Sequence, residues 1–236
     1  PNGQSIIDGC FAGNAVLCPN IIRTNGAIST VVVSPQNIAS QVVRGIDFES
    51  SYRLPLADIM DEWDGDLSFR LLANYNLKVT TFNPTLSTNQ FVDGRGVLGS
   101  FGASGYSGLT NPRYKLNGSI RYTTEQGSIN LGIRHTASGV YNNAFTECVT
   151  GCPANDARTI DNNDIASDTL VDLGMTYKPL PDASVDTEVF LSISNLLNSA
   201  PPFIAGNNSG SYYSGQNVRD YDTIGRFFTV GVRFKM

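Results

Sequence analysis

The sequence predicts an all-β chain that forms part of an antiparallel, up-and-down transmembrane β-barrel. Apolar and polar residues alternate with a period of two in seven long runs. Short and long connections alternate between these runs, and charged residues make up only 16% of the chain. Each run is close to or above the length of about 9 to 11 residues that a tilted strand needs to cross a bilayer. Membrane-crossing strands therefore account for all three observations.

Composition excludes two other classes of protein. A transmembrane helix needs about 20 mostly apolar residues in a row, and the nearest approach here is the short stretch Val31–Val33. The chain has 16 basic and 21 acidic residues and a net charge of -5, so a nucleic-acid-binding surface is not expected.

The N-terminal region, residues 1–41, contains no run long enough to span a bilayer. Its short β-forming pieces, Ile21–Ile22 and Ile28–Val33, flank Asn25–Gly26, a dipeptide typical of tight hairpin turns. We expect residues 1–41 to form an extracellular loop with a small hairpin, and residues 42–236 to form one barrel segment.

The seven runs that follow each predict one strand. In the first run Ile46 and Phe48 alternate with Asp47 and Glu49, and the second keeps the same pattern with a lapse at Leu72. The third and fourth are separated by the short stretch Glu125–Gly127, which predicts a tight hairpin. The last run places Phe228, Val230, Val232 and Phe234 on one face. The predicted strands lie near residues 43–54, 66–78, 114–124, 128–139, 169–178, 185–196 and 226–236.

The connections between these strands predict the orientation of the barrel. Residues 55–65, 125–127 and 179–184 form short connections, whereas 79–113, 140–168 and 197–225 form long ones. An antiparallel count back from Met236 places every short turn on the periplasmic side, where the chain ends, and every long loop outside the cell. Trp63 then lies in a periplasmic turn as an interface anchor. Seven strands cannot close an antiparallel barrel, so we expect at least one more strand before Pro1.

A soluble β-sandwich would show the same alternation, with its apolar face in the core. Three features favour the membrane: the strand length, the one-sided loop lengths and the tyrosines near strand ends. These tyrosines are Tyr52, Tyr75, Tyr114, Tyr122 and Tyr177.

The four cysteines form two close pairs in loop-like stretches, Cys10 with Cys18 and Cys148 with Cys152. Such pairs indicate two disulfides and an oxidising compartment. A zinc site is the alternative, but the chain has one histidine, His135, and neither pair has the usual two-residue spacing.

Four segments, in chain order, are similar to motifs of one family. The stretch Tyr221–Met236 resembles the end of a TonB-dependent receptor, where an Asp and a Gly-Arg pair lead into an alternating aromatic strand. Arg44–Arg53 resembles that family's Gly-x-Asp-x-Glu-x-x-Tyr strand, and Asn195–Asn198 with Pro201–Pro202 resembles its penultimate strand exit. Cys10–Ile28 resembles a loop found before the Gly-Ile-Asp strand. The resemblance covers nearly the whole chain, although the family usually ends in Phe rather than Met.

The resemblance implies a barrel of about 22 strands with an N-terminal plug, in the bacterial cell outer membrane. The chain would be the C-terminal part of this barrel, with the plug and the TonB box upstream. The implied partners are outer-membrane lipid, the plug and the remaining strands, the TonB complex and the barrel-assembly machinery. No cofactor is expected. The C-terminal assembly signal would comprise Phe228, Val230, Val232, Phe234 and Met236.

Residues with potential chemistry do not predict an enzyme. Asp47 and Glu49 share one strand face, which invites a glycosidase interpretation. A solvated charge ladder with Arg53 and Arg70 is the simpler interpretation in a polar lumen. His135 has no partners for a catalytic triad or a metal site.

Ligand binding is more plausible for the aromatic residues of the long loops. The candidate contacts are Tyr106, Tyr141, Phe145, Tyr212 and Tyr213. The function expected is TonB-dependent uptake of a scarce nutrient of the siderophore, cobalamin or oligosaccharide class. A passive porin-like barrel and a secreted sugar-binding β-sandwich are the alternatives.

Overall fold

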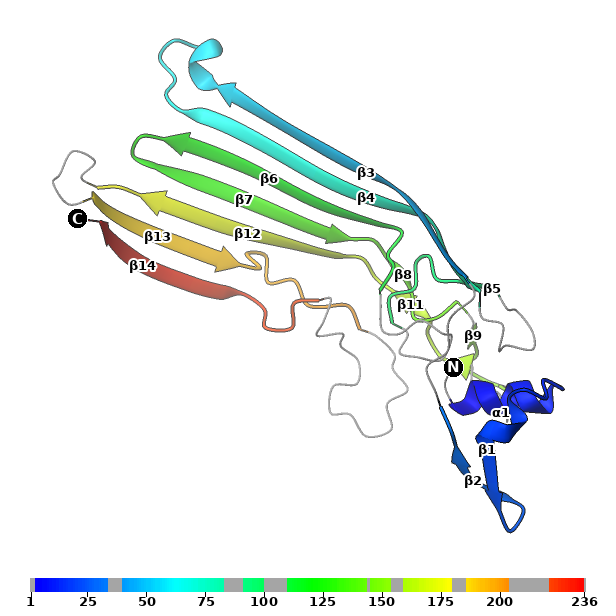
Figure 1. Ribbon diagram of the computed structural model, residues 1–236. Coiled ribbons are helices and arrows are strands. Elements are labelled where there is room, and N and C mark those ends of the chain that lie inside the picture. Colours follow the sequence, from blue (N-terminus) through cyan, green and yellow to red (C-terminus); the bar gives the residue numbers. More distant parts are fainter. Residues whose placement is uncertain are drawn as a thin grey trace. The chain divides into compact units, whose positions relative to one another are not determined.

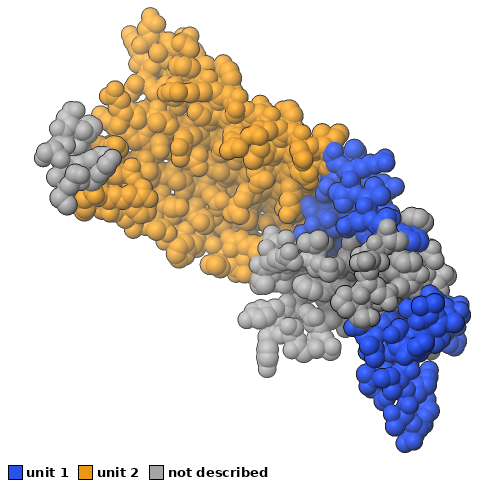
Figure 2. All heavy atoms as spheres, in the orientation of Figure 1, with its two compact units in different colours: residues 1–45, 76–113, 139–164 blue, residues 46–75, 114–138, 165–236 orange. Residues whose placement is uncertain are grey.

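A computed structural model describes residues 3–33, 40–82, 91–99, 110–143, 145–153, 159–179, 186–203 and 221–235. The chain is mainly β-structure, and its long strands are antiparallel, as predicted (Figure 1). Among these residues, none of the helices has the length and apolar character required to pass through a membrane. The chain divides into two compact units (Figure 2).

The larger β-sheet confirms the seven predicted strands. Each long strand pairs with its neighbours in the chain, in the order β14-β13-β12-β7-β6-β4-β3, so the sheet is a meander (Figure 1). The strands are β3 (Ser40–Pro55), β4 (Asp66–Phe82), β6 (Tyr114–Thr124), β7 (Gly127–Thr136), β12 (Asp168–Tyr177), β13 (Asp186–Ser194) and β14 (Phe227–Lys235).

Most strand ends differ from the prediction by one to four residues, and two of these differences have a local cause. Strand β7 ends at Thr136 instead of residue 139, since Gly139–Val140 forms the separate short strand β8. Strand β4 continues to Phe82 because its last residues pair with β5 (Phe91–Asp93), a strand that was not predicted.

The strand register keeps residues of one kind in continuous rows across the sheet. One row, on the apolar face, joins Phe69, Ile120, Leu131, Leu173, Ile193 and Phe228 through successive strand pairs. A neighbouring row on the other face joins Ser68, Arg121, Asn130, Gly174, Ser192 and Thr229. A slip by one residue would mix the two faces, so the alternation excludes a register shift by an odd number of residues.

The apolar face is exposed rather than packed into a core. The side chains of Phe48, Ile120 and Phe228 are 54%, 41% and 56% exposed. Contiguous apolar surface of this extent is rare on soluble monomers and marks contact with protein or lipid. This face therefore requires apolar surroundings.

Tyrosines lie at both ends of the apolar face. At the long-loop end, Tyr75 pairs in register with Tyr114, which stacks on His135 at a centroid distance of 5.6 Å. At the short-turn end, the Tyr122 hydroxyl donates a hydrogen bond to the Asp64 carbonyl oxygen at 3.0 Å. The stretch from Tyr114 to Tyr122 covers about 27 Å along the strand, or about 21 Å at the usual barrel tilt. This height is close to the apolar band of about 25 Å in outer-membrane barrels.

The N-terminal residues form a helix and a hairpin. Helix α1 (Gly3–Phe11) was not predicted; it precedes the short 3-10 helix η1 (Cys18–Asn20). The predicted hairpin is present as β1 (Ile21–Thr24) and β2 (Ala27–Val31). Its turn residues Asn25 and Gly26 have φ values of 53° and 83°, as a tight hairpin turn requires.

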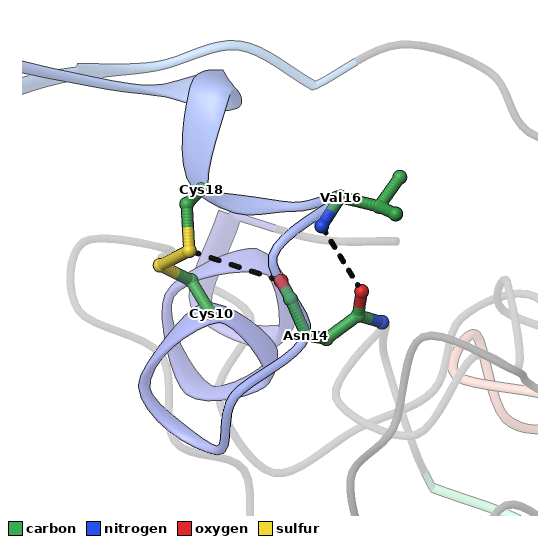
Figure 3. Close-up of a disulfide and its surroundings, with 4 residues drawn as sticks. All are labelled: Cys10, Asn14, Val16 and Cys18. Atoms are coloured by element: carbon green, nitrogen blue, oxygen red, sulfur yellow. Dashed lines mark hydrogen bonds between the residues drawn. A yellow bond between two sulfur atoms is a disulfide. The ribbon is translucent and has the colours of Figure 1, made fainter.

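A disulfide between Cys10 and Cys18 ties the end of α1 to η1, as predicted (Figure 3). Between them, Asn14 Oδ1 accepts a hydrogen bond from the Val16 amide at 3.3 Å, and its carbonyl oxygen lies 3.8 Å from Cys18 Sγ. Ile6 and Leu17 are buried beside the linked segment. The second predicted disulfide joins Cys148 to Cys152.

The remaining short elements lie in the connections between the long strands. Helix η2 (Leu56–Asp58) lies in the connection between β3 and β4. The others are β8 (Gly139–Val140), β9 (Thr146–Glu147), β10 (Thr159–Ile160) and β11 (Asp164–Ile165). Strands β9 and β10 pair in parallel next to the second disulfide.

A substitution at Gly127 tests how closely strands β7 and β12 approach each other. A Cβ at this position would collide with the Thr176 carbonyl oxygen, whereas a Cβ at Gly132 in the same strand would meet the Asp172 side chain at an ordinary 3.9 Å. We expect Gly127→Ala to lower the free energy of unfolding by about 1–3 kcal/mol, because backbone must shift. Urea titration of the folded protein in detergent would measure it. Equal effects of Gly127→Ala and the control Gly132→Ala would contradict this prediction.

The disulfides predict the thiol content of the folded protein. All four cysteines are paired, so alkylation without reductant should label none of them and alkylation after reduction should label all. Peptide mass mapping should recover Cys10 with Cys18 and Cys148 with Cys152. Any cross-pairing between the two sets would contradict the structure.

Candidate functional site

Ion pairs between neighbouring strands line the polar face of the sheet. Among the described residues they are Arg53–Asp66 at 2.6 Å, Arg70–Glu49 at 2.8 Å, Arg134–Asp172 at 3.0 Å and Arg233–Glu188 at 2.7 Å. Most of these side chains are largely exposed, so each pair adds little to stability. Their main effect is to neutralise charge in pairs along this face.

Asp47 and Glu49 belong to this charge ladder. Asp47 Oδ1 accepts a hydrogen bond from Asn74 Nδ2 at 2.6 Å, and Glu49 pairs with Arg70. Arg53, the other predicted neighbour, pairs with Asp66 instead. Both carboxylates are held by the neighbouring strand, which supports the ladder interpretation over a glycosidase one.

Asn195 is the most buried polar residue at the end of the sheet, with no solvent exposure. Its side chain accepts a hydrogen bond from the Ser199 amide at 2.8 Å and donates one to the Ser199 carbonyl oxygen at 2.9 Å. Its own amide donates to Asp172 Oδ1 at 2.9 Å, and the other oxygen of Asp172 holds Arg134. Asn195 thus links the exit of β13 to strands β12 and β7.

Asn195 and Asn198 form a corner of the chain between β13 and β14. Asn198 is the residue that reaches the last strand. Its Oδ1 accepts a hydrogen bond from the Arg226 amide at 3.1 Å, immediately before β14. Asn195 and Asn198 have φ values of 50° and 53°, in the left-handed region that asparagine tolerates better than most residues. The Asn-Leu-Leu-Asn motif therefore sets the geometry of the chain between β13 and β14.

A pocket of about 470 Å³ lies beside this corner. Leu170 and Tyr221 in its lining are buried, whereas Phe227 and Ile224 are exposed. Arg134 and Asp222 are the charged groups in the lining. The pocket combines apolar side chains with one group of each charge.

A second, shallower hollow of about 370 Å³ lies toward the short-turn end of the polar face. Its lining combines small polar residues and two aromatic residues, Tyr52 and Phe69, with three arginines, Arg53, Arg70 and Arg121. Arg121 lies in register between Ser68 and Asn130 of the neighbouring strands.

Two of the predicted ligand contacts lie together in a described loop. The rings of Tyr141 and Phe145 are 5.5 Å apart at an interplanar angle of 49°. The Tyr141 amide donates to the Asn163 carbonyl oxygen at 2.7 Å, and the Asn163 amide donates to Glu147 Oε1 at 2.8 Å. These bonds give the aromatic pair a fixed support.

The other predicted site residues fall into two groups. Tyr106, Tyr212, Tyr213 and Met236 lie outside the described residues. His135 Nδ1 lies 2.8 Å from Thr169 Oγ1, and no cluster of potential metal ligands occurs in the described part of the chain. Phe228, Val230, Val232 and Phe234 lie exposed on one face of β14.

Sequence reasoning missed the role of Asn195 and the Arg121 hollow. The Asn-Leu pair was noted only as a motif, although asparagine before a loop signals a left-handed residue. The hollow depends on residues from four strands, whose register no local pattern reveals.

The substitution Asn195→Ala tests how much the corner between β13 and β14 contributes to stability. This change removes both hydrogen bonds to Ser199 and places alanine at a positive φ, so we expect a loss of about 2–4 kcal/mol in unfolding free energy. Fluorescence of Trp63, the one tryptophan of the chain, can follow unfolding in urea. Asn117→Ala is the control, because the Asn117 side chain is exposed and makes no hydrogen bond within the described part of the chain. A similar loss in both variants would contradict a specific role for Asn195.

Comparison with known proteins agrees with this architecture. The sequence model of the family described as "TonB dependent receptor-like, beta-barrel" matches residues 13–196. Curated proteins and solved structures yield no match. The match covers most of the chain, and the open meander of long two-faced strands is the structure expected for part of such a barrel. The chain belongs to the TonB-dependent receptor β-barrel family.

Proposed function

We propose that this chain forms part of the wall and the extracellular loops of an outer-membrane transporter, which imports a scarce nutrient with energy relayed by TonB. The family is one of bacterial outer-membrane transporters rather than enzymes. The nutrient classes proposed are siderophores, cobalamin and oligosaccharides, and the site of action is the bacterial cell outer membrane.

The two-faced sheet is the observation that carries this proposal. In the row from Phe69 to Phe228 on its apolar face, Phe69, Ile120 and Phe228 are exposed, Leu131 and Leu173 are half-buried, and Ile193 is buried. Its opposite face bears paired charges. A soluble sandwich would cover the apolar face, whereas a barrel in a bilayer presents it to lipid and encloses the charges.

Aromatic residues of the long loops are the proposed ligand contacts. Tyr141 and Phe145 support this role because they form an aromatic pair on a hydrogen-bonded loop. Tyr106, Tyr212 and Tyr213 are proposed on their sequence context alone. Aromatic faces of this kind bind sugars and ring-containing ligands.

The proposed partners follow from the family. An upstream plug and further strands complete the barrel, and the TonB complex acts through the part of the receptor that contains the TonB box. The barrel-assembly machinery is proposed to bind the apolar face of β14, through Phe228, Val230, Val232, Phe234 and Met236.

Substitutions at Ile120 and Asn117, both in β6, test whether the apolar face of the sheet contacts lipid. Ile120 is on the apolar face near the middle of β6, and Asn117 is on the polar face. We expect Ile120→Arg to lower the stability of the receptor in lipid vesicles by about 2–4 kcal/mol, because an arginine would face hydrocarbon. Asn117→Arg should change it little. Two variants of equal stability, or a chain that stays monomeric and soluble without detergent, would contradict the proposal.

Uptake tests the transport function. Cells that carry the receptor should accumulate one of three labelled probes, a ferric siderophore, cobalamin or an oligosaccharide. Uptake should stop when TonB is deleted, which separates active transport from a passive pore. Tyr141→Ala should weaken binding of that probe about tenfold, whereas Tyr177→Ala, at the short-turn end of β12, should leave binding unchanged. Uptake that persists without TonB would favour the passive porin-like alternative.

A further inference from the structure

The tip of the hairpin formed by β1 and β2 holds an asparagine followed by a glycine, Asn25–Gly26. In such a pair the glycine amide nitrogen lies next to the asparagine side-chain carbonyl, and no Cβ on the glycine blocks its approach. The same pair occurs as Asn117–Gly118 in the middle of β6. A third pair, Asn2–Gly3, begins outside the described residues. The two described pairs have the same chemistry and differ in how the backbone holds them.

At the hairpin tip the glycine nitrogen is free of backbone pairing. The last paired residues are Thr24 and Ala27, so Asn25 and Gly26 alone form the connection. Within the described part of the chain, the Gly26 amide and the exposed Asn25 side chain make no hydrogen bond. A Cβ built on Gly26 would meet nothing within 4 Å. The tip therefore has the room that a rotation of the Asn25 side chain toward the Gly26 nitrogen requires.

In β6 the same pair is held from both sides. The register partners of Gly118 are Leu71 of β4 and Ile133 of β7. In an interior antiparallel strand the amide of each residue is bonded to one of the two neighbouring strands, so the Gly118 amide is fixed in the ladder. A reaction there requires local opening of the sheet, and interior strands open far less often than loop tips do.

We propose that Asn25 is a site of spontaneous deamidation in the folded receptor and that the sheet protects Asn117. The Gly26 amide nitrogen attacks Cγ of Asn25, the Cγ–Nδ2 bond breaks, and ammonia leaves with the proton of the Gly26 amide. Water then opens the cyclic imide, at the side-chain carbonyl to give aspartate or at the main-chain carbonyl to give isoaspartate. The net reaction consumes water, needs no oxidant or reductant, and adds a negative charge to the hairpin tip.

The two products have different effects on the hairpin. The φ value of Asn25 is 53°, and aspartate tolerates this left-handed conformation as asparagine does, so the aspartate product keeps the turn. Isoaspartate carries the main chain through its side-chain carbonyl and so lengthens the connection, which a two-residue turn does not accommodate. Its formation separates Thr24 from Ala27. The site is independent of the proposed transport, because it needs only this hairpin and water.

The test incubates the whole receptor in a non-ionic detergent and heavy-oxygen water at neutral pH. Hydrolysis of the imide takes its oxygen from water, so the isotope marks product that formed in the folded protein rather than during digestion. Peptide mass mapping should find labelled aspartate and isoaspartate at Asn25, formed at least about tenfold faster than at Asn117. Asn25→Gln should remove the label at this position, because glutamine would have to close a larger and less favourable ring.

Unfolding the same receptor in urea supplies the matched control. Both pairs are then free of the sheet, so Asn25 and Asn117 should react at rates within about twofold of each other. Equal rates in the folded receptor, or a faster reaction at Asn117, would overturn the proposal, because the hairpin tip would then have no advantage. It would also be overturned if the folded receptor gave no label at Asn25 over a period in which the unfolded receptor is labelled there.

Discussion

In-register pairing of neighbouring strands is the constraint on which the rest of this structure depends. Backbone groups in a hydrocarbon environment have no water to bond, so each strand must satisfy its partners within the sheet. The pairing also decides which side chains become neighbours. It joins Phe69 to Ile120 on one face and Ser68 to Arg121 on the other. The lipid-facing surface, the charge ladder and the Arg121 hollow all follow from one register.

The corner at Asn195 shows how a loop is attached to such a sheet. Asp172 accepts from the Asn195 amide with one oxygen and binds Arg134 with the other. One carboxylate therefore connects strand β7 to the exit of β13, while Asn198 reaches the residue before β14. The connection between β13 and β14 is therefore attached to the sheet near both of its ends, through the part-buried hydrogen bonds of Asn195 and the exposed bond between the Arg226 amide and Asn198.

The sheet could be predicted from sequence because its signals are local. Period-two alternation defined all seven strands, and Asn25–Gly26 defined the hairpin turn. Helix α1 was missed because Gly3–Phe11 has neither acidic residues in its first turn nor basic residues in its last, and a buried Ile6 and the Cys10–Cys18 disulfide hold it instead. Strand β5 was missed because it is only Phe91–Asp93. The residues around the Arg121 hollow are far apart in the sequence. Alternation predicts on which face of the sheet each of them lies, but not which residues of neighbouring strands lie side by side.

The meander has a kinetic consequence. Within the described sheet every long strand pairs with the long strand before it and the long strand after it in the chain, so the sheet can grow by the addition of one strand at a time. The cost of closing a connection rises only slowly with its length. The hairpin of β6 and β7, joined by Glu125 and Gln126 alone, has the smallest closure entropy, and it lies in the interior of the strand order. Strands added on both sides of this hairpin would extend a sheet that already separates apolar from polar surface.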